Sequence, residues 1–193
     1  NGATPVPGRG TRFDNPILGV AAAAAAGAMD AAGVPVEALV RALAAFQPLP
    51  HRMQWIRRIG GVDFIDDSKA TNLAALAAAL AAVPGPVRLI AGGLLKETEL
   101  EAVKEVLAKK CKKVYGIGKS SPLLEAAWRD RVSFENCGVL ADAVRKAWRD
   151  ASAGETVLLS AGCASFDQFR GYADRGEQFT CIVQALETEK ERP

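Results

Sequence analysis

The chain has 193 residues, 49% of them hydrophobic, and its 24 Lys and Arg against 22 Asp and Glu leave a net charge of +2 at pH 7. This length holds one domain or one and a half, and the apolar content is enough for a sizeable core. Charges of both signs are interspersed. That pattern excludes the basic stripe of a nucleic-acid-binding protein and the polybasic patch of a membrane-surface protein.

The four cysteines are far apart and form no Cys-x-x-Cys pair, and His51 is the single histidine. We therefore expect no metal site made by this chain alone. Unpaired thiols are typical of a reducing compartment, so a cytoplasmic location is expected. We expect no signal peptide, because no charged segment precedes an apolar core at the N-terminus. The apolar run 17–29 is shorter than the about 20 residues of a membrane span, which favours a buried helix.

The N-terminal part of the chain predicts a helical pair. Residues 1–15 are rich in Gly, Pro and Thr and lack an initiator Met, so we expect a fragment of a longer protein. Helices are predicted over residues 16–29 and 36–46, and the Pro-punctuated segment that follows predicts a domain boundary near residue 50. Residues 1–49 are thus expected to be the incomplete end of one domain, and residues 50–193 a second domain.

Beyond residue 50 the pattern alternates between strands and helices. Strands 53–59 and 62–65 flank Gly60-Gly61 and predict a hairpin. The elements expected next are helix 72–82, strand 87–91, helix 98–109, strand 113–116, helix 121–129, strand 132–135, helix 138–151, strand 156–160 and a helix over about 174–188. Short Val, Ile and Leu-rich strands between helices predict βαβ units. The fold class is therefore α/β, a Rossmann-like, mainly parallel sheet with flanking helices.

The most informative segment is 66–72, Asp-Asp-Ser-Lys-Ala-Thr-Asn. It follows an apolar run and opens an Ala/Leu-rich helix, so it is predicted to be a turn at the carboxyl end of a strand, where open α/β sheets bind ligands. Thr71 or Asn72 is suited to cap the helix, and the N–H groups behind a cap attract anions. The alternative is a capped turn with solvated charges. The density of functional groups favours a binding site.

Other strand ends are predicted to reach the same edge of the sheet. Together they supply ammonium and hydroxyl groups from Lys69, Lys96, Lys119, Thr71, Ser160 and Ser165. This set suits a small molecule that carries two carboxylates or phosphates. A lone histidine is usually structural, but His51 and Arg52 stand beside the domain boundary, where an imidazole can stack on a base and a guanidinium can pair with phosphate.

Two nucleotide-binding motifs are imitated but not matched. Gly118-Lys119-Ser120 follows a strand as in a P-loop, but the glycine required five positions before Gly118 is Lys113. We expect an ordinary strand–helix turn with an N-capping Ser. The dinucleotide fingerprint also fails, because Ser121 stands where its third glycine belongs. A nucleotide-binding Rossmann module or oxidoreductase therefore stays a minor alternative.

Several segments together resemble the Mur ligases of peptidoglycan synthesis, and among them the branch that adds D-glutamate. They are His51-Arg52, segment 66–72, Ile90-Ala91-Gly92-Gly93 with Lys96, stretches 158–160 and 163–169, and Arg175-Gly176 with Phe179. Segment 66–72 is the most specific, because the other branches carry different sequences there. The resemblance presents residues 50–188 as the C-terminal amino-acid-binding domain and residues 1–49 as the end of the central ATPase domain.

The resemblance implies an ATP-dependent ligase that forms an amide bond. ATP phosphorylates the carboxylate of UDP-N-acetylmuramoyl-L-alanine, the amine of D-glutamate attacks the acyl phosphate, and Mg²⁺ offsets the phosphate charge. By resemblance, D-glutamate is held by Thr71, Lys96, Ser165 and Tyr172. ATP is met by His51, Arg52, Asp67 and Lys69, with Asp67 and Lys69 also catalytic. The intact enzyme is expected to be a monomer.

The sequence also departs from the family pattern. The P-loop and most magnesium ligands of the family would lie upstream, so this chain alone is expected to be inactive. Gln54 stands where Glu is usual, Leu94-Leu95 replaces a polar pair, and Ala161-Gly162 replaces Pro-Ala. These differences leave open a sister ligase with another amino-acid preference. A non-catalytic binding or scaffold module is the remaining alternative.

Overall fold

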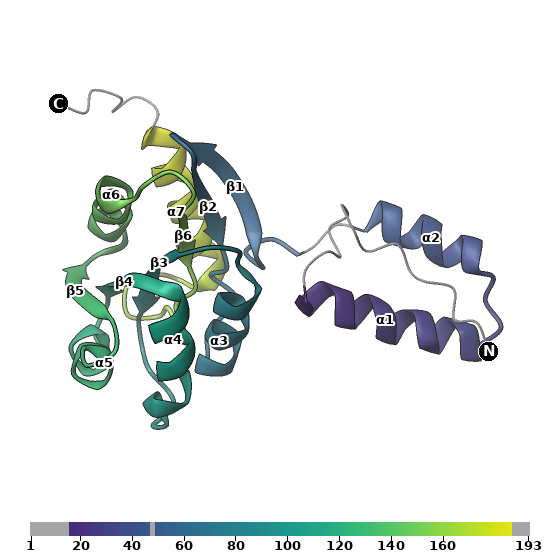
Figure 1. Ribbon diagram of the computed structural model, residues 1–193, viewed down its shortest axis with the longest axis horizontal. Coiled ribbons are helices and arrows are strands. Elements are labelled where there is room, and N and C mark those ends of the chain that lie inside the picture. The colour runs from purple at the N-terminus through teal and green to yellow at the C-terminus, as the bar shows by residue number, and fades with distance from the viewer. Residues whose placement is uncertain (1–15, 47–48, 187–193) are drawn as a thin grey trace. The chain divides into compact units, whose positions relative to one another are not determined.

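The computed structural model describes residues 16–46 and 49–186 (Figure 1). Its contacts divide the chain into two compact units, residues 1–48 and 49–193, and each is described by itself. The loop expected over residues 1–15 and the end of the last predicted helix, beyond residue 186, lie outside the described residues.

The first unit contains two helices, α1 (Pro16–Ala31) and α2 (Val36–Ala45). Among its described side chains only Ala22 and Leu39 belong to a core, while Val20 is 72% exposed. The pair thus has too little buried apolar surface to be stable by itself. In the described parts of the chain, no helix has the length and apolar character needed to cross a membrane.

The second unit is a six-stranded sheet with helices on both faces. Its elements are β1 (Gln54–Ile59), β2 (Val62–Asp66), α3 (Leu73–Ala82), β3 (Val87–Gly92), η1 (Leu100–Val103), α4 (Lys104–Lys110), β4 (Cys111–Ile117), α5 (Ser121–Trp128), β5 (Ser133–Gly138), α6 (Leu140–Asp150), β6 (Thr156–Leu159) and α7 (Tyr172–Ala185). The strand order is β1-β2-β6-β3-β4-β5. Only the β1–β2 hairpin is antiparallel. The predicted Rossmann-like α/β fold is confirmed.

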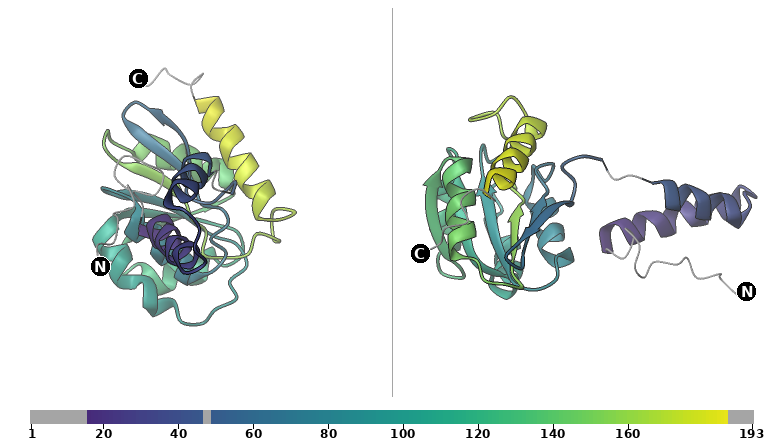
Figure 2. Two further views of the ribbon diagram at one scale, coloured as in Figure 1. Left: turned by 90° about the vertical axis from the view of Figure 1, so that its right-hand side faces the viewer. Right: turned by 90° about the horizontal axis from the view of Figure 1, so that it is seen from above.

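Two hydrophobic cores lie on opposite faces of this sheet. One joins the sheet to α6 and α7 and includes Val157 and Leu159, whereas the other joins it to α3, α4 and α5 and includes Leu158 (Figures 1 and 2). Successive strand residues point to opposite faces, so a strand buried on both sides must be largely apolar. All four residues of β6 are buried accordingly.

Two local predictions were wrong in detail. The helix expected over residues 98–109 begins as the 3₁₀ turn η1 and becomes α-helical only at Lys104. Ser120 stands at the N-cap of α5, but its side chain makes no capping bond. Its hydroxyl instead accepts a hydrogen bond from Leu95 N–H at 2.9 Å, because the strand-end loop carrying Leu95 packs against it.

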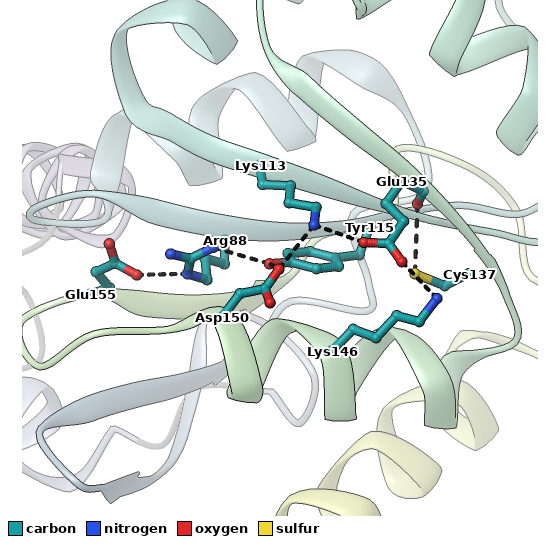
Figure 3. Close-up of polar contacts among 8 residues, drawn as sticks. All are labelled: Arg88, Lys113, Tyr115, Glu135, Cys137, Lys146, Asp150 and Glu155. Carbon is teal, nitrogen blue, oxygen red and sulfur yellow. Dashed lines mark hydrogen bonds and ion pairs between the residues drawn. The ribbon is translucent and has the colours of Figure 1, made fainter.

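A network of polar side chains ties α6 to the sheet (Figure 3). Tyr115 is its centre: the hydroxyl donates to Asp150 Oδ2 at 2.7 Å and accepts from Arg88 Nη1 at 3.0 Å. Arg88 also pairs with Glu155 at 2.6 Å. Burial raises the pKa of Tyr115, so its hydroxyl keeps its proton. The outer ion pairs are Lys113–Glu135, Lys113–Asp150 and Lys146–Glu135.

Replacing Tyr115 with Phe is expected to lower the free energy of unfolding by about 1–2 kcal/mol, because the fully buried Tyr115 side chain loses its two hydrogen bonds, to Asp150 and Arg88. The matched control is Tyr172→Phe, since no hydrogen bond to the Tyr172 hydroxyl is found among the described residues. Urea unfolding of both variants is the measurement. Equal stability of the two variants would contradict a structural role for the network.

Candidate functional site

The loops after β2, β3, β4 and β6 meet at one edge of the sheet and are joined by backbone hydrogen bonds. Gly92 N–H donates to Ala161 O at 2.9 Å, and Ser120 N–H donates to Gly93 O at 2.9 Å. Leu94 forms an isolated antiparallel bridge with Ala164. The edge is therefore a preformed platform rather than a set of separate loops.

Glycine is required where these loops approach each other most closely. Gly92 and Gly93 have φ angles of 125° and 134°. A Cβ on Gly92 would lie 2.1 Å from Ile117 O, and one on Gly93 would lie 2.2 Å from Ala164 O. Only glycine tolerates both the positive φ and the contact.

The backbone of the loop after β4 is not available to a phosphate. Four successive N–H groups of this loop make hydrogen bonds within the protein. The Gly118 N–H donates to Gly138 O and the Lys119 N–H to Asp167 Oδ2. The Ser120 N–H donates to Gly93 O and the Ser121 N–H to Gly118 O. A P-loop needs such groups free to cradle phosphate. The structure thus agrees with the rejection of a P-loop at this turn.

Segment 66–72 starts in the sheet and ends as a helix cap. Asp67 N–H donates to Leu159 O at 2.8 Å. Asn72 Oδ1 accepts from Ala75 N–H at 2.8 Å, so of the two predicted caps Asn72 is the one used. Asp66 is 0% and Asp67 6% exposed, which contradicts the alternative of a turn with solvated carboxylates.

Asp67 is a buried carboxylate with two hydrogen bonds. Its Oδ2 accepts from Ser160 Oγ at 2.9 Å and its Oδ1 from Met53 N–H at 3.2 Å. Burial raises the pKa of Asp67 to about 6, against the opposing effect of the two hydrogen bonds. The nearby Asp66 carboxylate acts in the same direction as burial. The site therefore holds a carboxylate that changes charge close to neutral pH.

Arg175 holds three of the loops to α7. Its Nε and Nη2 donate to Ser68 Oγ at 2.8 Å and to Ser68 O at 2.7 Å, and Nη1 donates to Cys163 O at 3.2 Å and to Gly92 O at 3.5 Å. The side chain is 0% exposed. Burial lowers the pKa of Arg175 to about 10, so the guanidinium stays charged at pH 7.

Beyond the resemblance, no role was predicted for Arg175 from the sequence. Its spacing did indicate a buried position: Arg175, Phe179 and Val183 follow one another at four-residue intervals on α7, and all three are buried. A cation on the core-facing stripe of a helix requires several hydrogen-bond partners.

His51 pairs with Asp66 beneath α7. Its Nδ1 lies 2.7 Å from Asp66 Oδ2, and its carbonyl accepts from Lys69 N–H at 3.0 Å. His51 has a φ of 60°, a conformation that residues other than glycine rarely adopt. Gly176 makes the pair possible, because a Cβ there would lie 2.1 Å from His51 Nδ1 and 2.6 Å from Asp66 Oδ2.

Lys69 and Tyr172 bring the two predicted subsites together. Lys69 Nζ lies 4.1 Å from the centroid of the Tyr172 ring, a cation–π distance. The ring of His51 stands edge-on to Tyr172 at 6.4 Å between centroids. Lys69 and His51, predicted for ATP, therefore adjoin Tyr172, predicted for D-glutamate.

The remaining predicted residues differ in their exposure. Arg52, Lys96 and Lys119 are exposed, Thr71 is half-buried and Ser165 is buried. Thr71 and Lys96 come from loops that are linked by a hydrogen bond between Leu73 N–H and Glu97 Oε2. No cluster of three or more His, Cys, Asp or Glu side chains that could hold a metal ion occurs within residues 16–46 and 49–186.

Substituting Gly176 with Ala is expected to lower the free energy of unfolding by about 1–3 kcal/mol, the usual effect of forced overpacking. The new methyl group must displace the His51 imidazole from Asp66. Gly171→Ala is the control, because a Cβ at Gly171 meets nothing within 4 Å. Thermal unfolding and the His51 ring proton shifts are the measurements. An unmoved His51 in a stable Gly176→Ala variant would contradict the close packing.

Asp67→Asn is expected to stabilise the chain at pH 8 and to have little effect near pH 4. The folded pKa of about 6 lies above the ordinary aspartate pKa of 3.8, so the proton is bound more tightly in the folded state, and stability falls as pH rises from about 4 to about 6. The full shift corresponds to roughly 2–3 kcal/mol. Urea unfolding from pH 4 to 8 is the measurement. A gain that grows toward acid pH would contradict the raised pKa.

Solved structures with the same fold include several ligases. A UDP-N-acetylmuramate–alanine ligase from Thermotoga maritima matches with a TM-score of 0.65 at 13% identity, over 91% of this chain and 39% of that one. A pseudomurein peptide ligase type C from Methanothermus fervidus matches with a TM-score of 0.62 at 17% identity, over 88% of this chain and 36% of that one. At such identities the likeness shows the fold alone.

Curated relatives are closer in sequence. UDP-N-acetylmuramoylalanine–D-glutamate ligases from Pelodictyon phaeoclathratiforme and Methylococcus capsulatus are 41% and 40% identical over 167 and 165 residues. These matches cover 86% of this chain but only 35% and 36% of the relatives, so the chain spans about a third of their length. The family model described as "Mur ligase, glutamate ligase domain" matches residues 51–163, and the chain belongs to this Mur ligase family.

Proposed function

We propose that this chain is the amino-acid-binding part of an ATP-dependent ligase that adds D-glutamate to UDP-N-acetylmuramoyl-L-alanine in peptidoglycan synthesis. The observation that carries the proposal is the platform of strand-end loops built on segment 66–72, in a chain about 40% identical to ligases of that name. We further propose that the enzyme is cytoplasmic and that its intact form is a monomer.

D-glutamate is assigned to the lysine and hydroxyl groups of the platform. A dicarboxylate needs directional, charge-assisted donors, which Lys96, Thr71 and Ser165 supply. Tyr172 adds an aromatic wall that already carries Lys69 on its face.

ATP is assigned to the residues around Lys69 and His51, which adjoin Tyr172. Lys69 and Arg52 are cations suited to phosphate, and His51 supplies a ring suited to stack beside a nucleoside. Bound ATP would supply the phosphoryl group that activates the substrate carboxylate. We assign Asp67 and Lys69 to the catalytic machinery that faces ATP. Most magnesium ligands are assigned to residues outside this chain.

The two compact units support a domain assignment. Residues 50–193 are proposed to be the amino-acid-binding domain and residues 1–49 the end of a central ATPase domain. The exposed apolar side chains of α1 and α2, such as Val20 and Val40, support a helical pair that packs on a larger partner surface. The chain alone is accordingly expected to leave ATP unhydrolysed.

A sister ligase with another amino-acid preference is the second candidate. Leu94 and Leu95 are half-buried beside Lys96, and Leu94 is bridged to Ala164. Apolar side chains at this rim favour a substrate with a less polar side chain. The two candidates differ in the ligand that the platform prefers.

Titration of the chain with D-glutamate and with L-glutamate, followed by NMR, tests the proposal. We expect D-glutamate to shift the amide signals of Thr71 and Ser165. Lys96→Ala should weaken this binding at least about tenfold, since a charge-assisted hydrogen bond is worth about 1.5–3 kcal/mol. Lys119→Ala, which removes an exposed lysine from the same edge, is the control. Preference for L-glutamate would favour the sister ligase, and equal effects of both lysine variants would contradict the assigned site.

A further inference from the structure

An internal carboxylate occupies the start of helix α3. Glu97 Oε2 accepts a hydrogen bond from Leu73 N–H at 3.2 Å, and Leu73 is the first residue of the helix. The Ala75 N–H is taken by Asn72, the cap. The N–H groups at the start of a helix attract anions because they lack partners within the helix. Glu97 therefore fills a position that is suited to a carboxylate.

This position lies within the part of the platform assigned to D-glutamate. Thr71 is two residues before Leu73, and Lys96 directly precedes Glu97. The loop of Glu97 also adjoins the loop that carries Ser165, because Leu94 is bridged to Ala164. One carboxylate of the chain thus stands among the groups expected to receive a carboxylate of the substrate.

The loop that carries Glu97 is fixed at one end and exposed at the other. Leu94 is bridged to Ala164, and Leu95 N–H donates to Ser120 Oγ at 2.9 Å. Residues 96 to 99 are exposed. The exposed Glu97 side chain accepts a single hydrogen bond from α3, donated by Leu73 N–H. Breaking this bond therefore requires no movement of the core.

We propose that Glu97 is an internal competitor for the amino-acid substrate and leaves the start of α3 when the substrate carboxylate binds. The inference rests on the proposed function. Two carboxylates repel each other, and one N–H group cannot serve both at full strength. Glu97 thereby weakens the binding of dicarboxylates and favours ligands able to displace it.

A merely structural role for Glu97 makes the opposite prediction. If the side chain only stabilises the start of α3, its removal loosens the helix and weakens the binding of any ligand nearby. If it competes, its removal strengthens that binding. Glu99 offers a matched control, because it is an exposed glutamate of the same loop and its side chain makes no capping bond to η1.

The test compares D-glutamate binding by the unaltered chain, Glu97→Ala and Glu99→Ala, followed by NMR. We expect Glu97→Ala to bind about fivefold more tightly than Glu99→Ala, the size of effect typical of a carboxylate at a helix start. The Leu73 amide should also shift in Glu97→Ala before ligand is added, and in the unaltered chain during titration. Equal or weaker binding by Glu97→Ala would overturn the inference.

A second probe separates this inference from the proposed function. Acetate carries a carboxylate but none of the other features of an amino acid, and it should move the Leu73 amide in Glu97→Ala and not in the unaltered chain. If acetate gives this result and D-glutamate does not bind, Glu97 is a competitor for carboxylates but D-glutamate is not the substrate. If D-glutamate binds the unaltered chain and Glu97→Ala equally, D-glutamate is supported as the substrate and the competition by Glu97 is contradicted. If acetate leaves the Leu73 amide unmoved and D-glutamate does not bind, both proposals are overturned.

Discussion

The buried guanidinium of Arg175 is the interaction on which the binding edge depends. Its hydrogen bonds reach Ser68, Cys163 and Gly92, which belong to the loops after β2, β6 and β3. A buried cation without partners is strongly unfavourable, so the loops and α7 must adopt the arrangement in which all these bonds form together. The shape of the edge is thereby fixed before any ligand arrives.

Charge is concentrated around this guanidinium. Asp66 and Asp67 lie beside it, and burial raises the pKa of both carboxylates. Such desolvated groups oppose folding, and they persist because the two hydrophobic cores and the network around Tyr115 stabilise the rest of the unit. Perturbed pKa values are typical of functional sites, where a charge must respond to a bound ligand.

The fold by itself does not determine which substrate a protein of this architecture binds. The same architecture occurs in a UDP-N-acetylmuramate–alanine ligase and in a bifunctional folylpolyglutamate synthase/dihydrofolate synthase from Yersinia pestis, at 13% and 20% identity. Specificity must therefore come from side chains and not from the fold. In this chain the loop after β3 carries the half-buried Leu94 and Leu95 and the exposed, acidic Glu97.

The sequence by itself determined the order of elements, the β1–β2 hairpin and a helix cap at Thr71 or Asn72, because periodicity, glycine pairs and capping residues act over a few neighbouring positions. Only the tertiary structure decided which distant groups meet. His51 and Asp66 are 15 residues apart, and Arg175 and Ser68 are 107 apart. The Ser120 hydroxyl likewise accepts a hydrogen bond from the distant Leu95 N–H and does not cap its own helix. Local signals cannot determine such pairs, because the contacts form only when the strands align and bring their ends together.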